Sequence, residues 1–131
     1  AAARGRSSVR PEAVCSMDEA AVAKGAVLPT ARIAAIQAVK HTWSSSPLCH
    51  QIPISDVDVA VEPTSDGIAI TVTVRTRGPT GCEMEALQGV LTGLATVWDM
   101  VKANEKDTDG QYPETRISDV RVTDKQKRPP D

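Results

Sequence analysis

Aromatic residues are nearly absent from this sequence, which has two Trp, one Tyr and no Phe among 131 residues. A basic excess is missing as well, since 15 Lys and Arg residues stand against 17 Asp and Glu, for a net charge of -2 at pH 7. Proteins that bind nucleic acid usually need a basic surface, and those that bind single strands also need aromatic side chains on which bases stack. The composition therefore argues against nucleic acid as a partner.

Long hydrophobic runs and targeting segments are missing too. Around the central predicted helix, the uncharged run from Ala86 to Trp98 falls short of the ~18 apolar residues that a membrane-spanning helix needs. The first residues, AAARGR, have no apolar stretch behind the arginines, which argues against a secretory signal. We therefore expect a soluble protein with no membrane partner.

Cysteines are few and show no pairing in their spacing. Cys15, Cys49 and Cys82 are odd in number and far apart, and no C-x-x-C pair is present. This usage indicates reduced thiols, a cytoplasmic protein and no structural metal site. Phosphate-binding motifs of the P-loop and dinucleotide types are likewise missing, and the acids of DTDG stand too close to the glycine for an EF-hand.

What is present suits one domain. A chain of 131 residues with 40% hydrophobic content can bury one core, and a second core would be too small to be stable. We predict a single domain over residues 1–124 and a disordered polar tail over residues 125–131.

Periodicity and turn residues predict the elements of this domain. Thr30 is the expected N-cap of the second helix, and PTSDG is the expected turn of a hairpin. The predicted strands are Gly5–Val9, Ile54–Glu62, Ile68–Val74 and Arg116–Thr123, and the predicted helices are Pro11–Lys24, Pro29–Trp43 and Gly81–Asp107. This order predicts an α+β sandwich in which an antiparallel sheet carries its helices on one face.

The long predicted helix has an unusual uncharged centre. One side carries small residues, including Gly89 and Gly93, where a solvated helix would normally present charges. Because Gly within a helix costs about 1 kcal/mol relative to Ala, we interpret the two glycines as a close approach of another backbone, most simply that of a second subunit. The other side is an apolar stripe that we expect to face the sheet, formed by Leu87, Val90, Leu91, Leu94, Val97, Trp98 and Val101.

Charged residues lie at the two ends of the same helix. Asp99 and Lys102 share a face three residues apart, which suits either joint action on one ligand or an ordinary surface ion pair. Glu83 and Glu85 open the helix, where acids also occur simply because they complement the helix dipole. Since Glu85 and Asp99 are about 21 Å apart along a straight helix, one small ligand cannot contact both ends within one chain.

Cations and one histidine point to a small anionic ligand. Arg32 and Lys40 fall on the apolar stripe of the second predicted helix, where they either serve a site or extend to solvent. His50 lies in a loop with a proline on either side, and such a rigid loop could hold a side chain that binds phosphate or transfers protons. A loop histidine with no functional role fits the pattern equally well. Lys24 and Arg75 offer further positive charge. The pattern alone identifies no particular ligand.

Four motifs in a fixed order resemble one family: KGAVLPTARIAAIQAVKHTW, PLCHQIP, TGCEMEALQGV and VWDMVKANEKD. Over residues 24–123 the sequence is similar to the MoaC family, the cyclic pyranopterin monophosphate synthases of molybdenum cofactor (molybdopterin) biosynthesis, and closest to archaeal members. The resemblance implies a ferredoxin-like α+β fold and a homohexamer, a trimer of dimers with active sites at the dimer interface. It also implies a lyase that converts (8S)-3',8-cyclo-7,8-dihydroguanosine 5'-triphosphate to cyclic pyranopterin monophosphate and diphosphate.

The resemblance further implies roles for residues of this chain. It makes Asp99, Lys102 and Lys24 the catalytic residues. It assigns substrate binding to Leu48, Cys49, His50, Arg75, Glu83, Met84 and Glu85. These types suit the chemistry, because a departing diphosphate needs cations and the rebuilding of a guanine-derived ring needs proton donors and acceptors. No redox cofactor is implied, and Mg²⁺ on the diphosphate is compatible with the reaction but has no dedicated ligand cluster.

Three features depart from the family pattern. The sequence starts after an N-terminal segment that is usual in the family, Ala26 stands where the family commonly has Asp, and Ser44–Ser46 replace an acid and an apolar residue.

Two other functions stay open, a non-catalytic nucleotide-binding module on the same fold and a purely structural oligomerisation domain. The first predicts phosphate binding without turnover. The second predicts that Asp99 and Lys102 can be replaced without loss of ligand binding.

Overall fold

The computed structural model describes residues 1–10 and 26–126 of the chain. Its elements are β1 (Ala2–Ser8), α2 (Val27–Lys40), α3 (Thr42–Ser45), β2 (Ile54–Pro63), β3 (Gly67–Thr76), α4 (Glu83–Glu105) and β4 (Arg116–Asp124). The helix predicted over Pro11–Lys24, and with it the candidate residue Lys24, lies outside the described residues. The four predicted strands are all present, and β1 begins three residues earlier than its small residues indicated.

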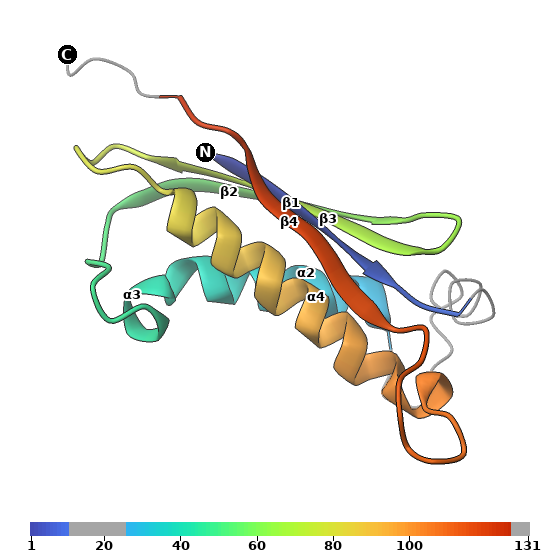
Figure 1. Cartoon of the computed structure of the whole chain (residues 1–131). Helices are drawn as coiled ribbons and strands as arrows, with labels where there is room; N and C mark the ends of the chain where they lie inside the picture. The colour runs from blue at the N-terminus through green and yellow to red at the C-terminus, as the bar shows by residue number, and fades with distance from the viewer. Residues whose placement is uncertain (11–25, 127–131) are drawn as a thin grey trace.

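The strands form one antiparallel sheet in the order β2-β3-β1-β4. β2 and β3 are the predicted hairpin, and Pro63 pairs with Ile68 next to its turn. α2 and α4 lie side by side against the same face of the sheet (Figure 1). The α+β prediction is confirmed, and the arrangement is consistent with a ferredoxin-like fold.

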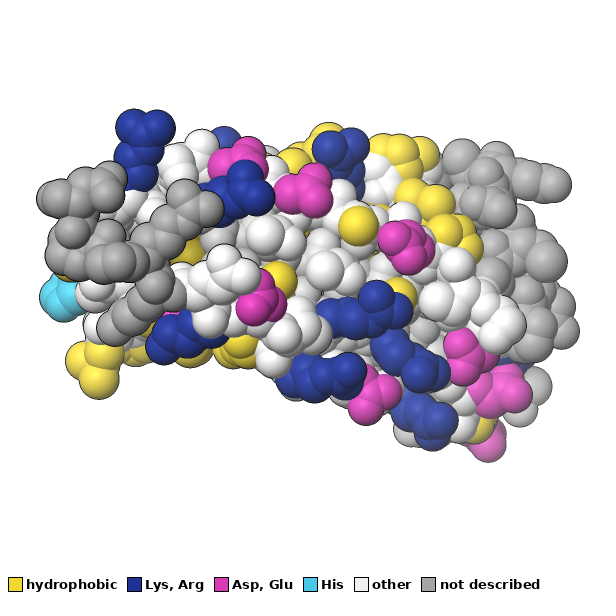
Figure 2. All heavy atoms as spheres, turned by 90° about the horizontal axis from the view of Figure 1, so that it is seen from above, with side chains coloured by type: hydrophobic (Ala, Val, Ile, Leu, Met, Phe, Trp, Pro, Cys, Tyr) yellow, Lys and Arg dark blue, Asp and Glu magenta, His cyan; other side chains and the backbone are white. Residues whose placement is uncertain are grey.

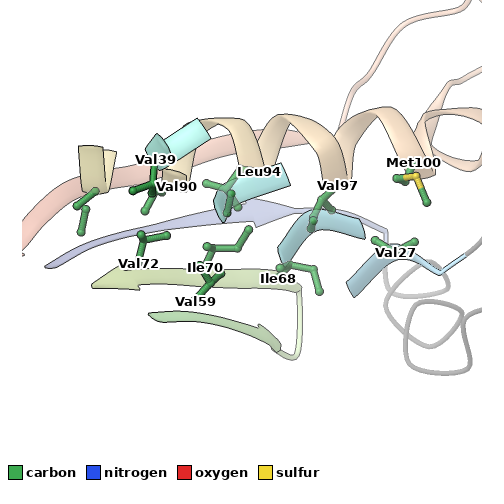
Figure 3. Close-up of a cluster of buried hydrophobic side chains, with 14 of the residues drawn as sticks. Val27, Val39, Val59, Ile68, Ile70, Val72, Val90, Leu94, Val97 and Met100 are labelled. Carbon is green, nitrogen blue, oxygen red and sulfur yellow. The ribbon is translucent and has the colours of Figure 1, made fainter. Parts of the chain in front are cut away.

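The core lies between this face and the two long helices. Ile68, Ile70, Val72 and Val74 of β3 are fully buried, as the alternation of the strand predicts. In Figure 3 their labelled members point towards the helices, which contribute Val39 from α2 together with Val90, Leu94 and Val97 from α4. β3 therefore supplies a full row of buried side chains to the core and packs mainly against α4, while α2 packs mainly over β2.

The helix α2 begins at Val27, so the predicted N-cap role of Thr30 is wrong. Ala26 takes the cap position in an extended conformation, and the Thr30 hydroxyl donates a 2.6 Å hydrogen bond back to its carbonyl. Pro29 is tolerated inside the first turn because its missing N–H would have no partner there. Arg32 and Lys40 are exposed, since the buried side of α2 is a narrow row made by Val27, Ala31, Ala35 and Val39.

The helix α4 faces the core with its glycines, which overturns the proposed subunit contact at these residues. A Cβ added to Gly89 would lie 2.9 Å from Val39 Cγ2, and one added to Gly93 would lie 2.9 Å from Ile70 Cδ1. The close approach is therefore between α4, α2 and β3 of the same chain. Leu91 of the predicted stripe is 42% exposed instead. Within the described ranges, no helix is both long enough and apolar enough to cross a bilayer.

Candidate functional site

The loop after α3 and the first turn of α4 together line a hollow of about 260 Å³. Its lining residues are Leu48, Cys49, His50, Ile52, Thr80, Gly81, Glu83, Met84 and Glu85. Two motifs far apart in the sequence, Leu-Cys-His and Glu-Met-Glu, therefore meet at one place, and six of the seven predicted binding residues belong to it. Among residues 1–10 and 26–126, no group of three or more His, Cys, Asp and Glu side chains could hold a metal ion.

Hydrogen bonds fix the loop on both sides of His50. The Cys49 amide donates to the Ser46 carbonyl at 3.0 Å, and the Thr76 hydroxyl donates to the Pro53 carbonyl at 2.6 Å. Between these attachments the loop presents His50 to solvent, and Leu48 is 94% exposed. A histidine with this access can contact a ligand without a rearrangement of the core.

Glu83 is held as a carboxylate by a lysine from the other end of the chain. Lys125 Nζ lies 2.7 Å from Glu83 Oε1, and this hydrogen bond, followed by one from the glutamate's own backbone, lowers the pKa of Glu83. Gly81 leaves the space, because a Cβ there would collide with the Glu83 carboxylate. Lys125 was not among the predicted site residues. Its position in a polar segment of the sequence does not indicate this contact, because Lys125 comes close to the start of α4 only when β4 pairs antiparallel with β1.

Glu85 has the opposite electrostatic environment. It is 5% exposed, and desolvation is the main cause that raises its pKa, with a smaller contribution from the negative charge of Glu83. Two carboxyl groups with pKa values shifted in opposite directions are the arrangement by which enzymes separate a permanent anion from a group that exchanges protons. Glu83 therefore suits a fixed negative charge and Glu85 suits proton transfer.

The second charged group lies near the other end of α4. Lys102 Nζ is 3.0 Å from Asp99 Oδ1, the i, i+3 contact that their spacing predicts. Their side chains are 42% and 56% exposed, so both can contact a ligand or another molecule. The pair is separated from the hollow by about 20 Å, because an α-helix rises about 1.5 Å per residue. One chain therefore does not bring the two groups together.

The surface of α4 between these groups is uncharged. Met84 and Leu91 are 44% and 42% exposed, and Ala95 is exposed on the same side one turn further on. No charged residue interrupts the helix between Glu85 and Asp99. Exposed apolar side chains in a row between two polar groups are typical of a surface that contacts another protein.

Arg75 does not lie with the other predicted binding residues. The alternation of β3 turns Val74 towards the helices and Arg75 towards the open face of the sheet, where Asp56 Oδ2 is 3.7 Å from its guanidinium. Figure 2 shows this face, with side chains of both charges spread over it. Within one chain, Arg75 therefore contacts neither the hollow nor the Asp99–Lys102 pair.

Comparison with known proteins identifies relatives along nearly the whole chain. The model of the MoaC family matches residues 1–128. A protein of Natronomonas pharaonis called probable cyclic pyranopterin monophosphate synthase is 56% identical over 128 residues, which cover 98% of this chain and 80% of that protein. A Halobacterium salinarum protein of the same description is 59% identical over 110 residues, or 84% of this chain and 68% of the relative. A Methanothermobacter thermautotrophicus protein, called probable cyclic pyranopterin monophosphate synthase accessory protein, is 52% identical over 127 residues, or 97% of this chain and 80% of the relative.

Proposed function

The chain belongs to the MoaC family, and on that premise we propose that it acts in molybdenum cofactor biosynthesis as a cyclic pyranopterin monophosphate synthase. The proposed substrate is (8S)-3',8-cyclo-7,8-dihydroguanosine 5'-triphosphate. The proposed products are cyclic pyranopterin monophosphate and diphosphate, so the enzyme is a lyase that breaks a phosphorus–oxygen bond. The observation that carries the proposal is the hollow at the start of α4, which gathers the Leu-Cys-His and Glu-Met-Glu motifs.

The residues around the hollow suit this reaction. A cyclic phosphate that forms with loss of diphosphate places negative charge on the departing group. His50, which lines the hollow, and Lys125, which contacts the lining residue Glu83, are hydrogen-bond donors that would stabilise this charge. Opening and rebuilding the ring requires proton transfer, for which the raised pKa of Glu85 is suited. Lys24, assigned to catalysis by the family resemblance, would add a further cation. The proposed reaction needs no redox cofactor, and Mg²⁺ would bind through the diphosphate.

We further propose that Asp99 and Lys102 complete the hollow of a second copy of the chain. Leu91 lies halfway between Glu83 and Asp99 along α4. If two α4 helices pack antiparallel about a two-fold axis near Leu91, the Asp99–Lys102 pair of each copy lies beside the hollow of the other. The uncharged surface formed by Met84, Leu91 and Ala95 suits this contact. Three such dimers would form the homohexamer implied by the family resemblance, in the cytoplasm.

The first test is turnover by the unmodified protein. The purified chain is incubated with the cyclised dihydro-GTP, and release of diphosphate is measured alongside binding of the nucleotide. We expect diphosphate release from the parent protein and from an Asp58→Asn control, whose aspartate is exposed on β2 and is not among the residues that line the hollow. Binding without release would instead support the non-catalytic nucleotide-binding module. Absence of both would leave the structural oligomerisation domain.

A further inference from the structure

The last residue of α4 is a buried carboxyl group. Glu105 is 1% exposed, and its Oε1 accepts hydrogen bonds from the Arg10 amide at 3.0 Å and the Thr115 hydroxyl at 2.9 Å. Its Oε2 is buried and has no hydrogen-bond partner among the residues that the structure describes. Burying a carboxyl group is costly, and a negative charge is further disfavoured at the C-terminus of a helix. This placement calls for a role beyond filling space.

Glu105 connects three segments that are distant in the sequence. Arg10 follows β1, Thr115 precedes β4, and Glu105 ends α4, so one side chain attaches the end of the helix to two neighbouring strands. A buried amide or hydroxyl that loses its acceptor is left unsatisfied, which is more damaging than the loss of the hydrogen bond itself. An apolar residue could fill the same volume but could not make this attachment.

A second attachment holds α4 on the other side of the Asp99–Lys102 pair. The ring of Trp98, the residue before Asp99, lies 5.0 Å from the ring of Tyr112, centroid to centroid. Tyr112 belongs to the loop between α4 and β4, and this loop is itself ordered by Asp107, whose Oδ1 accepts from the Asp109 and Gln111 amides at 2.9 Å. Trp98 and Glu105 thus attach the helix to the same loop, one before the pair and one after it.

The orientation of the pair depends on how the last turns of α4 are held. Asp99 and Lys102 are about half exposed, and they occupy the last turns of a helix, where hydrogen bonds normally fray. Catalytic groups must be held to within about 0.5 Å of their working geometry. We propose that Glu105 is a positioning residue, which attaches the last turns of α4 to β1 and β4 so that Asp99 and Lys102 are presented in one orientation. This inference rests on the proposed function, in which the pair takes part in the reaction.

The test compares three variants of the full chain. Glu105→Gln keeps an oxygen that can accept both hydrogen bonds, Glu105→Leu keeps the volume and loses them, and Thr115→Val removes only one donor. Glu114→Leu is the matched control, since it makes the same chemical change at an exposed glutamate whose carboxylate lies 3.1 Å from the Arg10 side chain. We measure kcat and KM for diphosphate release, and backbone hydrogen exchange over residues 98–106.

If Glu105 positions the pair, Glu105→Leu lowers kcat at least about tenfold while KM changes less than about threefold. Thr115→Val gives a smaller loss of the same kind, and Glu105→Gln and Glu114→Leu remain close to the parent. Hydrogen exchange over residues 98–106 is faster in Glu105→Leu and Thr115→Val only. The proposal is overturned if exchange is unchanged in both, or if kcat falls no more than the folded fraction does.

Diphosphate release and hydrogen exchange test the proposed function and the role of Glu105 separately. If the parent protein releases no diphosphate, the proposed function fails, and hydrogen exchange still decides whether Glu105 holds the end of α4. If Glu105→Leu does not fold, Thr115→Val carries the test, because it leaves the carboxyl group in place. Unchanged exchange and unchanged kcat in Thr115→Val would then sink the proposal.

Discussion

The two ends of α4 present their charged groups in opposite ways. At the first turn, Glu83 and Glu85 lie in a hollow, and their pKa values are shifted apart by Lys125 and by burial. Near the last turn, Asp99 and Lys102 form an ion pair whose side chains are 56% and 42% exposed. This difference is the reason for the proposal that the exposed end of α4 completes the hollow of a second copy of the chain.

Replacing the exposed pair should have the largest effect on activity. Asp99→Asn removes a carboxylate without changing its size, and Lys102→Ala removes the cation beside it, so under the proposed function we expect kcat to fall about 10²- to 10⁴-fold in either variant. Diphosphate release measures this loss. Asp58→Asn, an exposed aspartate on β2, is the control. Full activity of both pair variants would show that the exposed end of α4 has no part in the reaction.

Mixing two inactive variants tests whether the ends belong to different copies. Asp99→Asn carries an intact hollow, whereas Glu85→Gln carries an intact pair. If each site combines the hollow of one copy with the pair of another, one site in a mixed dimer has both parts unchanged. After mixing equal amounts and allowing subunits to exchange, about one quarter of the parent activity should return. No recovery, with exchange shown by mass spectrometry, would place each site within one chain.

Removing the lysine that contacts Glu83 should have a smaller effect, which falls on stability. Lys125→Met takes away the hydrogen bond that keeps the pKa of Glu83 below its ordinary value of 4.5. A lowered pKa in the folded state contributes stability above pH 4.5 that is lost as the pH falls through the folded value. The variant should therefore lose up to about 1 kcal/mol of stability at pH 7, because the pair is partly exposed.

The difference in stability between the parent protein and Lys125→Met should also depend on pH. The difference between parent and Lys125→Met should shrink in acid, where Glu83 is protonated in both, and chemical denaturation from pH 3 to 7 measures it. Lys106→Met, which changes an exposed lysine at the end of α4, is the control. A difference that is constant with pH would mean that Lys125 acts through something other than the ionised Glu83.

Replacing Glu85 should change the stability by a similarly small amount, but with the opposite sign. The raised pKa of Glu85 means that stability is fully present below pH 4.5 and is lost as the pH rises through the folded value. Glu85→Gln cannot ionise, so at pH 7 it should be more stable than the parent by up to about 1 kcal/mol. The advantage should vanish in acid, as measured by thermal unfolding. Glu62→Gln, an exposed glutamate on β2, should show no such gain.

Sequence patterns predicted the parts of this fold that depend on neighbouring residues. The alternation of Ile68, Ile70, Val72 and Val74 identified the buried side of β3, and the i, i+3 spacing of Asp99 and Lys102 predicted their contact. The resemblance to a family predicted most residues of the hollow, because its motifs mark residues that meet only in the folded chain. Their roles in binding and catalysis stay predictions.

Other predictions were wrong because an apolar pattern does not state what it packs against. Gly89 and Gly93 were correctly recognised as places of close approach, but the approaching groups are Val39 and Ile70 of the same chain. The stripe that was expected to face the sheet is turned, so that Leu91 faces outward. The cause is that two small residues let α4 lie closer to α2 and β3 than larger side chains would allow.

By itself, then, the sequence determined the strands, the long helix, the ion pair near its end and the family, because these depend on periodicity and on motifs that are continuous along the chain. Only the tertiary structure decided that Lys125 reaches Glu83, that Glu105 joins β1 and β4 to α4, and that Arg75 faces away from the hollow. The physical reason is that these contacts depend on strand register and on which face of a strand is covered. The register and the covered face are determined by packing between segments that are far apart in the sequence.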